Sequence, residues 1–319
     1  MTESLAAPPH SAVAMPRAAR VARLACRSLV RATGLYSGRA RLAGSSLLRW
    51  IDGAPRGLTE ARLHDGSRIT VDPADYIGRP VYYFGDFDPK VSAVCTRLLR
   101  AGDVAVDIGA NIGSVALQMA RVVGPSGTVH AFEPQPDLAA RLAADARRNG
   151  FAQLVVHPVA LTSEDGTATF NVAVDNCGGA AINDAGAPGY RQITVATRCA
   201  NRYLDALEVR GPVRLVKIDV EGHEDIVIPM LLPWLFAIGT PPVVFESGTN
   251  DAFWSLPRVE ALRASGYTLY AILRTVMRLR LRLLQQAEPI PSSVHDFIAM
   301  PEAGSEHRAL RERLGPVLG

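Results

Sequence analysis

Residues 104–113 read Val-Ala-Val-Asp-Ile-Gly-Ala-Asn-Ile-Gly, and they carry the strongest structural signal in the chain. Its mostly apolar first half predicts a buried strand that ends at Ile108. Gly109 and Gly113 then predict a tight turn into a helix that we expect from Ile112 to Val123. Such a turn lets the backbone approach a ligand and presents free N–H groups at a helix N-terminus. The stretch therefore predicts an α/β sheet with a nucleotide-like ligand at its edge.

The segments on either side continue the alternation of strand and helix. Predicted strands span residues 104–108, 128–132, 154–157, 214–220, 243–246, 267–273 and 295–299, and predicted helices span 112–123, 136–149, 224–235 and 256–265. Repeated β-α-β units give parallel strands with helices on both faces of the sheet. We expect a Rossmann-like fold with a mostly parallel, seven-stranded sheet that contains one antiparallel strand. The period-two pattern of Leu and Arg in residues 273–284 predicts a further strand or a hairpin extension.

The chain divides into four predicted parts. They are a flexible tail with an Arg-rich helical extension (1–57), an N-terminal cap (58–100), the ligand-binding domain (101–302) and a C-terminal tail (303–319). In the cap, residues 61–63 and 68–71 predict a β-hairpin, and residues 90–99 predict a helix that Pro89 begins. Inside the domain, strands at 167–174 and 192–197 flank a predicted loop or lid at 176–189.

The Arg-rich extension holds eight arginines and no acidic residue between Arg17 and Arg49. Five of them recur at steps of three and four, from Arg17 to Arg31, and so predict one stripe on a helix. The helix is compatible with peripheral contact to an anionic membrane surface, with packing against the enzyme core, or with a transit peptide. The sequence leaves these three interpretations open.

Bulk composition narrows the class of protein. The 319 residues are 48% hydrophobic, which is ample for a buried core, and the net charge of +3 does not indicate a nucleic-acid partner. The four cysteines form no C-x-x-C pair, and no apolar run reaches the ~20 residues that a membrane span needs. We expect a cytoplasmic protein. The arginines are also compatible with peripheral contact at the inner face of the membrane.

Two acidic residues indicate the cofactor. Asp107 precedes the glycine turn, where it would repel the pyrophosphate of a dinucleotide but would suit the ammonium group of S-adenosylmethionine. Glu133 lies 26 positions later, at the end of the next predicted strand, where its carboxylate can accept hydrogen bonds from both ribose hydroxyls. Pro134 ends that strand. The sequence therefore predicts S-adenosylmethionine as the cofactor, bound also by Gly109 and Asn111.

A second charged cluster follows at residues 215–224, Leu-Val-Lys-Ile-Asp-Val-Glu-Gly-His-Glu. On a strand, period two would place Lys217, Asp219 and Glu221 on one face, where unpaired burial is costly, so we expect them to line a cleft. Methyl transfer to a hydroxyl requires a base, and Asp219, Glu221 and His223 are the catalytic candidates. Each of them also has a plain structural alternative as a capping or surface residue.

A metal ion is an open alternative at this cluster but is not part of the predicted site. Glu246 ends a neighbouring predicted strand, so its carboxylate could join Asp219 and Glu221 as a third oxygen ligand for Mg²⁺. The same carboxylates could equally hold Lys217 or a hydroxyl of the acceptor. We therefore predict no metal.

Three blocks of this chain resemble the FkbM family of methyltransferases. They are Asp-x-Gly-Ala-Asn-x-Gly at 107–113, Phe-Glu-Pro-x-Pro at 132–136 and Lys-x-Asp-x-Glu-Gly-x-Glu at 217–224. Weaker matches extend the resemblance over residues 83–301, including Val-Ala-Leu-Thr at 159–162. The family usually has Gly-x-Tyr-Glu where this chain has Gly85-Asp86-Phe87-Asp88, so a shorter acid stands in the place of the glutamate.

The resemblance implies a class I methyltransferase, often an O-methyltransferase of sugars, glycolipids or polyketide hydroxyls, with a small-molecule, glycan or glycolipid acceptor. It adds Asp88, Gly113 and Ala160 to the expected cofactor-binding residues. Two other classes remain open from the residues alone: a Rossmann-fold NAD-dependent oxidoreductase and a non-catalytic, membrane-associated scaffold.

Overall fold

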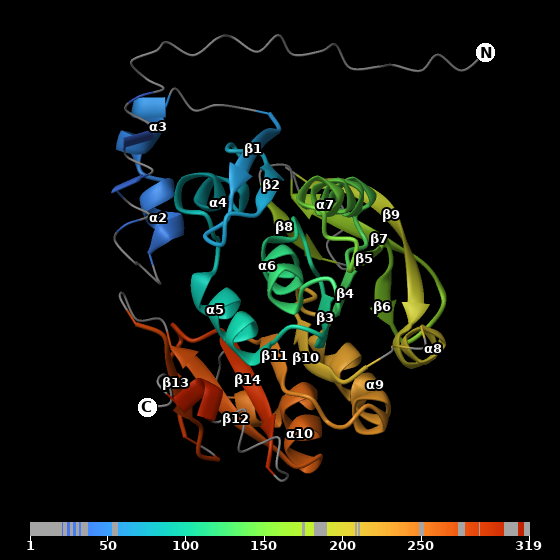
Figure 1. Ribbon diagram of the computed structural model, residues 1–319. Helices are drawn as coiled ribbons and strands as arrows, with labels where there is room; N and C mark the ends of the chain where they lie inside the picture. Colours follow the sequence, from blue (N-terminus) through green and yellow to red (C-terminus); the bar gives the residue numbers. More distant parts are fainter. Residues whose placement is uncertain are drawn as a thin grey trace, which may run out of the picture.

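The computed structural model describes most of the chain (Figure 1). It covers residues 38–52, 57–173, 176–181, 190–207, 209, 211–248, 252–273, 278–286, 288–302 and 312–315, with isolated positions between 21 and 32. The predicted tail 1–16, the arginine stripe from Arg17 to Arg31 and most of the predicted tail 303–319 lie outside this set. None of the described helices is long and apolar enough to cross a membrane.

One large sheet forms the centre of the molecule. In spatial order its strands are β13 (Arg280–Leu283), β12 (Tyr267–Leu273), β14 (Asp296–Pro301), β11 (Val243–Glu246), β10 (Val213–Ile218), β3 (Val104–Ile108), β4 (Thr128–Phe132) and β5 (Leu154–His157). The strands from β11 to β5 are parallel, and β14 runs antiparallel to both of its neighbours. The expected seven strands with one antiparallel member are present, in an order that places β10 and β3 side by side.

The sheet has one strand more than the predicted seven. Strand β13 pairs antiparallel with β12, in the register Ile272↔Leu281 and Leu273↔Arg280. The alternation of leucine and arginine matches burial only at the start of this edge strand, where Arg280 is exposed and Leu281 is fully buried, because Arg282 is half-buried and Leu283 is 44% exposed. The alternation therefore forms a hairpin extension, which was one of the two predicted forms.

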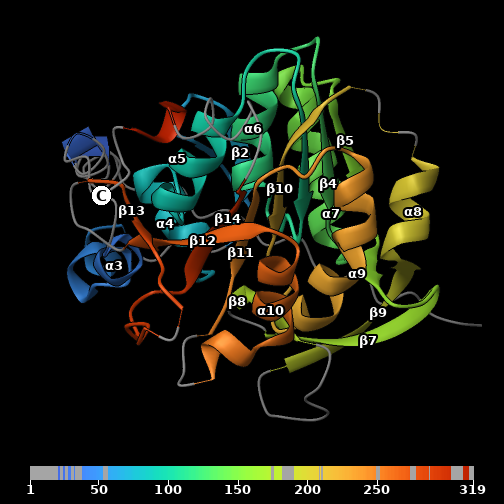
Figure 2. The same cartoon turned by 90° about the horizontal axis from the view of Figure 1, so that it is seen from below.

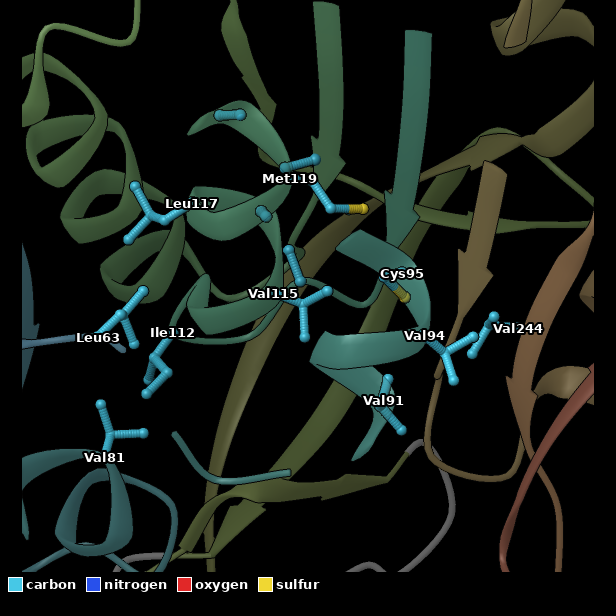
Figure 3. Close-up of a cluster of buried hydrophobic side chains, with 14 of the residues drawn as sticks. Leu63, Val81, Val91, Val94, Cys95, Ile112, Val115, Leu117, Met119 and Val244 are labelled. Atoms are coloured by element: carbon cyan, nitrogen blue, oxygen red, sulfur yellow. The ribbon is translucent and has the colours of Figure 1, made fainter. Parts of the chain in front are cut away.

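Helices cover both faces of the sheet, as Figure 2 shows. One layer contains α4 (Gly78–Phe84), α5 (Pro89–Leu98), α6 (Ser114–Val123) and α7 (Pro136–Asn149), and the other contains α8 (Ala200–Ala206), α9 (Glu224–Ala237) and α10 (Pro257–Ala264). Along β3, Ala105 packs into the first layer, whereas Val104, Val106 and Ile108 pack into the second. This alternation produces two hydrophobic cores, and Figure 3 shows part of the first, where Cys95 of α5 lies near Val115 of α6.

The predicted hairpin in the cap is confirmed. Strands β1 (Thr59–Arg62) and β2 (Arg68–Val71) pair antiparallel, and Gly66 in the turn has φ +89°. The hairpin attaches to the domain because Asp145 of α7 accepts hydrogen bonds from the backbone N–H of Thr70 at 2.6 Å and from its hydroxyl at 2.8 Å. Two short helices, α2 (Arg39–Ala43) and α3 (Ser46–Asp52), precede the hairpin, and α2 packs on α4.

A second, four-stranded sheet is inserted between β5 and α8. Its order is β6 (Ala160–Thr162), β9 (Tyr190–Cys199), β7 (Gly166–Ala173) and β8 (Asn176–Ala181). The prediction of a loop at 176–189 is wrong for residues 176–181, because this segment pairs with β7 as β8. Small residues dominate it, so it carries little of the β-branched signal by which strands are recognised. Residues 182–189 lie outside the described set.

Candidate functional site

A cavity of about 580 Å³ opens where the main sheet's parallel strands end. The turns after β3, β4 and β10 form much of its wall, and β6 and β7 of the second sheet close the opposite side. The carboxyl ends of parallel strands are where open α/β sheets bind ligands, so the cavity lies where the sequence predicted a site.

The glycine turn after β3 lies directly against the turn after β10. Gly109 has φ +81°, and a Cβ atom there would lie 1.7 Å from the backbone oxygen of Asp219. The two turns are joined because the backbone N–H of Asp219 donates to the carbonyl of Ile108 at 2.9 Å. Only glycine permits this approach of one backbone to another. Gly113, with φ +84°, packs instead against Leu142 of α7, away from the cavity.

Glu133 links the end of β4 to the glycine turn. One carboxylate oxygen accepts the backbone N–H of Asn111 and the other accepts that of Gln135, both at 2.8 Å. The side chain is buried, and burial raises the pKa of Glu133 to about 7 despite these hydrogen bonds. Because the carboxylate also lines the cavity, its remaining lone pairs are available to hydroxyl donors of a ligand.

We expect Glu133→Gln to weaken S-adenosylmethionine binding by roughly 10- to 100-fold, since a hydrogen bond to a charged group contributes about 1.5–3 kcal/mol. The amide nitrogen of the new glutamine side chain would face the backbone N–H of Asn111 or Gln135, two donors that cannot bond to each other. The side chain would also have one oxygen fewer to accept a hydrogen bond from the ligand. Titration calorimetry measures the change. Glu164→Gln is the matched control, because Glu164 lines the same cavity from the turn between β6 and β7. Equal affinities of the wild type and Glu133→Gln would contradict the assignment.

Asp107 is fully buried beneath the cavity and is paired with Lys217. The Lys217 ammonium lies 3.1 Å from an Asp107 oxygen and 3.5 Å from an Asp219 oxygen, and it donates to the Gly109 carbonyl at 3.2 Å. Burial alone would lower the pKa of Lys217, but the Asp107 and Asp219 carboxylates raise it above its usual value, so the side chain is an ammonium ion. Lys217 lines the cavity and Asp107 does not.

The predicted strand face at residues 217–221 is only partly formed. Strand β10 ends at Ile218, and the chain then turns with Glu221 at φ 49° and Gly222 at φ 92°. Glu224 holds this turn, because its carboxylate accepts the backbone N–H groups of Val220 at 2.8 Å and of Gly222 at 3.0 Å. Asp219 and Glu221 therefore reach the cavity from a turn and not from a regular strand.

Two carboxyl groups at or beside this turn, those of Glu221 and Glu246, have raised pKa values. Burial and the charge of Asp219 raise the pKa of Glu221 to about 7, and the same two causes raise that of Glu246, at the end of β11, to about 8. His223 is the N-cap of α9 and its Nε2 lies 3.1 Å from the hydroxyl of Thr162 on β6. Burial lowers the pKa of His223, so its imidazole is neutral at pH 7.

The sequence prediction missed a buried lysine that holds two acidic residues of the cavity wall. Lys90, on α5, is almost fully buried and forms ion pairs with Asp88, at 2.6 Å, and with Asp296 of β14. Asp88 is the N-cap of α5, and both of these carboxylates line the cavity. The sequence did contain one signal for Lys90, because only two of the 34 Lys and Arg residues of the chain are lysines. In the structure, both of these lysines are buried between two carboxylates.

The structure brings most of the predicted site residues to one cavity. Those that line it are Asp88, Gly109, Asn111, Glu133, Pro134, Ala160, Asp219, Glu221 and His223. Asp107 and Gly113 stand behind its wall. Within the described ranges, no group of three His, Cys, Asp or Glu side chains is arranged to hold a metal ion, so the Mg²⁺ alternative has no support there.

Comparison with known proteins identifies the family. The Methyltransferase FkbM domain model matches residues 107–277. The 31-O-demethyl-FK506 methyltransferase FkbM of Streptomyces tacrolimicus is 52% identical over 54 residues, which are 17% of this chain and 20% of that protein. The chain thus matches about a fifth of the length of this curated relative.

Similar solved structures include the O-methyltransferase TomG of Streptomyces achromogenes in complex with S-adenosylmethionine. It has 15% sequence identity and a TM-score of 0.39, and the match covers 68% of this chain and 81% of that one. An S-adenosylmethionine-dependent O-methyltransferase of Thermotoga maritima has 14% identity and a TM-score of 0.38, covering 78% of this chain and 94% of that one. The family match, which spans more than half of this chain, identifies a methyltransferase family and not an NAD-dependent oxidoreductase. The chain belongs to the FkbM family of methyltransferases, and its methyl donor is S-adenosylmethionine.

Proposed function

We propose that this enzyme methylates a hydroxyl group on a sugar, a glycolipid or a polyketide-type metabolite. The observation that carries the proposal is that one cavity is lined both by Glu133 with the glycine turn, which we take as the donor side, and by the Glu221 carboxylate, which we take as the acceptor side. The pKa of Glu221 is about 7. A hydroxyl acceptor must lose its proton during the transfer, and a base with a pKa near the working pH is the most effective.

On the donor side, the residues fit the methyl donor. The glycine turn permits close approach, the Glu133 carboxylate suits the ribose hydroxyls, and the Lys217 ammonium suits the carboxylate of the methionine half. Asp107 was predicted to meet the ligand's amino group, but its burial behind Lys217 supports an indirect role, in which it keeps Lys217 and the turn after β10 in place. When bound, S-adenosylmethionine supplies an electrophilic methyl group on a sulfonium centre.

On the acceptor side, Glu221 is the proposed base, and its place on a turn at φ 49° holds its carboxylate at the cavity. His223 orients the site through Thr162, and its neutral imidazole is a second acceptor for the hydroxyl proton. Asp219, tied to Lys217, joins the donor and acceptor sides. Transfer is an in-line displacement, so the main contribution of these residues is orientation, followed by removal of the proton.

The acceptor class rests on the resemblance and on the relative's name, which describes methylation of an O-demethyl compound. The walls support a neutral acceptor, because Asp88, Asp219, Glu221, Glu246 and Asp296 all line the cavity. Both lysines at the site already neutralise carboxylates. An acceptor that carries a phosphate or a carboxylate would be repelled by the ionised Glu221 carboxylate.

The test is transfer of a labelled methyl group from S-adenosylmethionine to neutral glycosides, extracted glycolipids and polyketide alcohols, with the products analysed by mass spectrometry and NMR. We expect a labelled methyl ether on a neutral acceptor. Label found only on amines, or only on phosphorylated sugars, would overturn the proposal. The binding of S-adenosylmethionine, measured in parallel, separates an inactive preparation from a wrong choice of acceptor.

A further inference from the structure

Helices α2 and α3 carry an exposed surface that combines apolar and basic side chains. We define the α2–α3 surface as Arg41, Leu42, Leu47, Arg49 and Trp50, all of which are exposed. The apolar members are 40% (Leu42), 62% (Leu47) and 81% (Trp50) accessible. Leu47 and Trp50 are three positions apart on α3 and therefore project from the same side of the helix.

The opposite side of the two helices attaches them to the enzyme. Ala43 is fully buried and Leu48 is 4% exposed, and both belong to the core that the first helix layer forms. Figure 1 shows α2 and α3 at the edge of the molecule beside α4, away from the main sheet. The helices thus bury a small face, whereas Leu47 and Trp50 project into solvent. In a soluble protein, large apolar side chains of a surface helix usually face the core instead.

The two charged members of the α2–α3 surface, Arg41 and Arg49, have the same sign. After Glu3, the first acidic residue in the chain is Asp52 at the end of α3, and eight arginines lie between these two acids. Arg41 and Arg49 are the ones whose exposed side chains belong to the described α2–α3 surface. A second copy of this chain would bring like charges together, whereas an anionic partner would neutralise them.

We propose that the α2–α3 surface binds the interface of a bilayer that contains anionic phospholipids. Leu47 and Trp50 enter the boundary between headgroups and acyl chains, where the amphipathic indole is favoured, and Arg41 and Arg49 pair with lipid phosphates. Neither the apolar nor the basic contribution suffices alone, because two or three apolar side chains give weak partitioning and the charge attraction is screened by salt.

The surface is also linked to the cavity through α4. Helix α2 packs on α4, and Tyr76 and Ile77, which immediately precede α4, line the cavity. Tyr76 is 55% exposed and meets the ring of Phe87 edge-on at 5.7 Å. This connection suits an acceptor with a lipid anchor. The docking itself does not depend on the identity of the acceptor.

Sedimentation of the full chain with vesicles of phosphatidylcholine, with and without phosphatidylglycerol, tests the proposal. We expect binding only with phosphatidylglycerol, and a loss of at least about tenfold for Arg41→Glu/Arg49→Glu and for Leu47→Ser/Trp50→Ser. The matched controls are Arg147→Glu on α7 and Phe236→Ser on α9, since both residues are exposed and lie outside this surface. Equal binding by the two double variants and the wild type would overturn the proposal.

Intrinsic fluorescence gives a second readout that does not depend on sedimentation. Trp234 is 4% exposed and the indole N–H of Trp254 donates to the Glu288 carbonyl at 2.8 Å, so a blue shift on adding vesicles reports Trp50. We expect this shift to disappear in Trp50→Phe while vesicle binding is largely kept. A Trp50-dependent dimer in size-exclusion chromatography, together with the absence of vesicle binding, would assign the surface to a second copy and refute the proposal.

Discussion

Lys217→Met is expected to lower the free energy of unfolding by about 3–5 kcal/mol, because it leaves the carboxylate of Asp107 buried without its partner. Asp107 is fully buried, and the Lys217 ammonium lies 3.1 Å from one of its oxygens. The same change removes the hydrogen bond to the Gly109 carbonyl, so the turn that supports the methyl donor should loosen as well. Denaturant unfolding, followed by circular dichroism, measures the loss.

A double variant and an exposed ion pair are the controls for this result. Asp107→Asn/Lys217→Met removes both charges, so it should recover part of the stability that the single variant loses. Arg68→Met breaks an exposed ion pair, in which the Arg68 Nε lies 3.9 Å from a Glu60 oxygen and the two side chains are 47% and 45% exposed. This variant should lower the free energy of unfolding by no more than about 1 kcal/mol. If Lys217→Met lowered the free energy of unfolding as little as Arg68→Met does, the buried pair would not be needed for the fold.

Glu221→Gln is expected to reduce kcat by about 10²- to 10⁴-fold, since the amide cannot accept the proton of the acceptor hydroxyl. The pKa of Glu221 is raised to about 7 by burial and by the charge of Asp219. The base acts when it is ionised, so wild-type activity should be full above this pH and should fall tenfold per pH unit below it. Steady-state rates between pH 5.5 and 9 measure both effects, in a range chosen to bracket this pKa.

The pH profile of the variant separates a base from a residue that only shapes the cavity. In Glu221→Gln the acidic limb should vanish and the residual rate should stay flat near pH 7, with the affinity for S-adenosylmethionine unchanged. Glu246→Gln is the matched control, because Glu246 lines the same cavity and its pKa of about 8 keeps it mainly protonated at pH 7. If the acidic limb persists in Glu221→Gln, another group is the base.

The parts of the fold that the sequence predicted well have strong local signals. The strands at 104–108, 128–132 and 154–157 and the helix at 136–149 have the predicted bounds. Each strand is a short, largely apolar run, and the helix begins at a proline and ends before Gly150, which adopts φ 72°. Such patterns depend on neighbours in the chain, so they can be interpreted without knowledge of the tertiary contacts.

The parts that were missed depend on contacts between distant segments. Helix α4 contains Pro80 and three consecutive aromatic residues, so burial against the hairpin and α2 determines its conformation more than helix propensity does. Glu221 leaves the strand face because Glu224 draws the backbone into a turn. Lys90 was predicted only as the start of a helix, and its contact with Asp296 on β14, far along the chain, makes it an ion-pair centre.

The inserted sheet has an evolutionary consequence. Strands β6 to β9 leave the main sheet after β5, and the chain returns through α8 to β10. Residues of β6, β7 and β9 line one wall of the cavity, while the turns after β3 and β4 line another wall, to which we assign the methyl donor. The two walls therefore belong to separate stretches of the gene. Substitutions, insertions or recombination within the first stretch can change which molecule is modified, while selection keeps the cofactor chemistry constant. A lineage can thus diversify its products without rebuilding the catalyst.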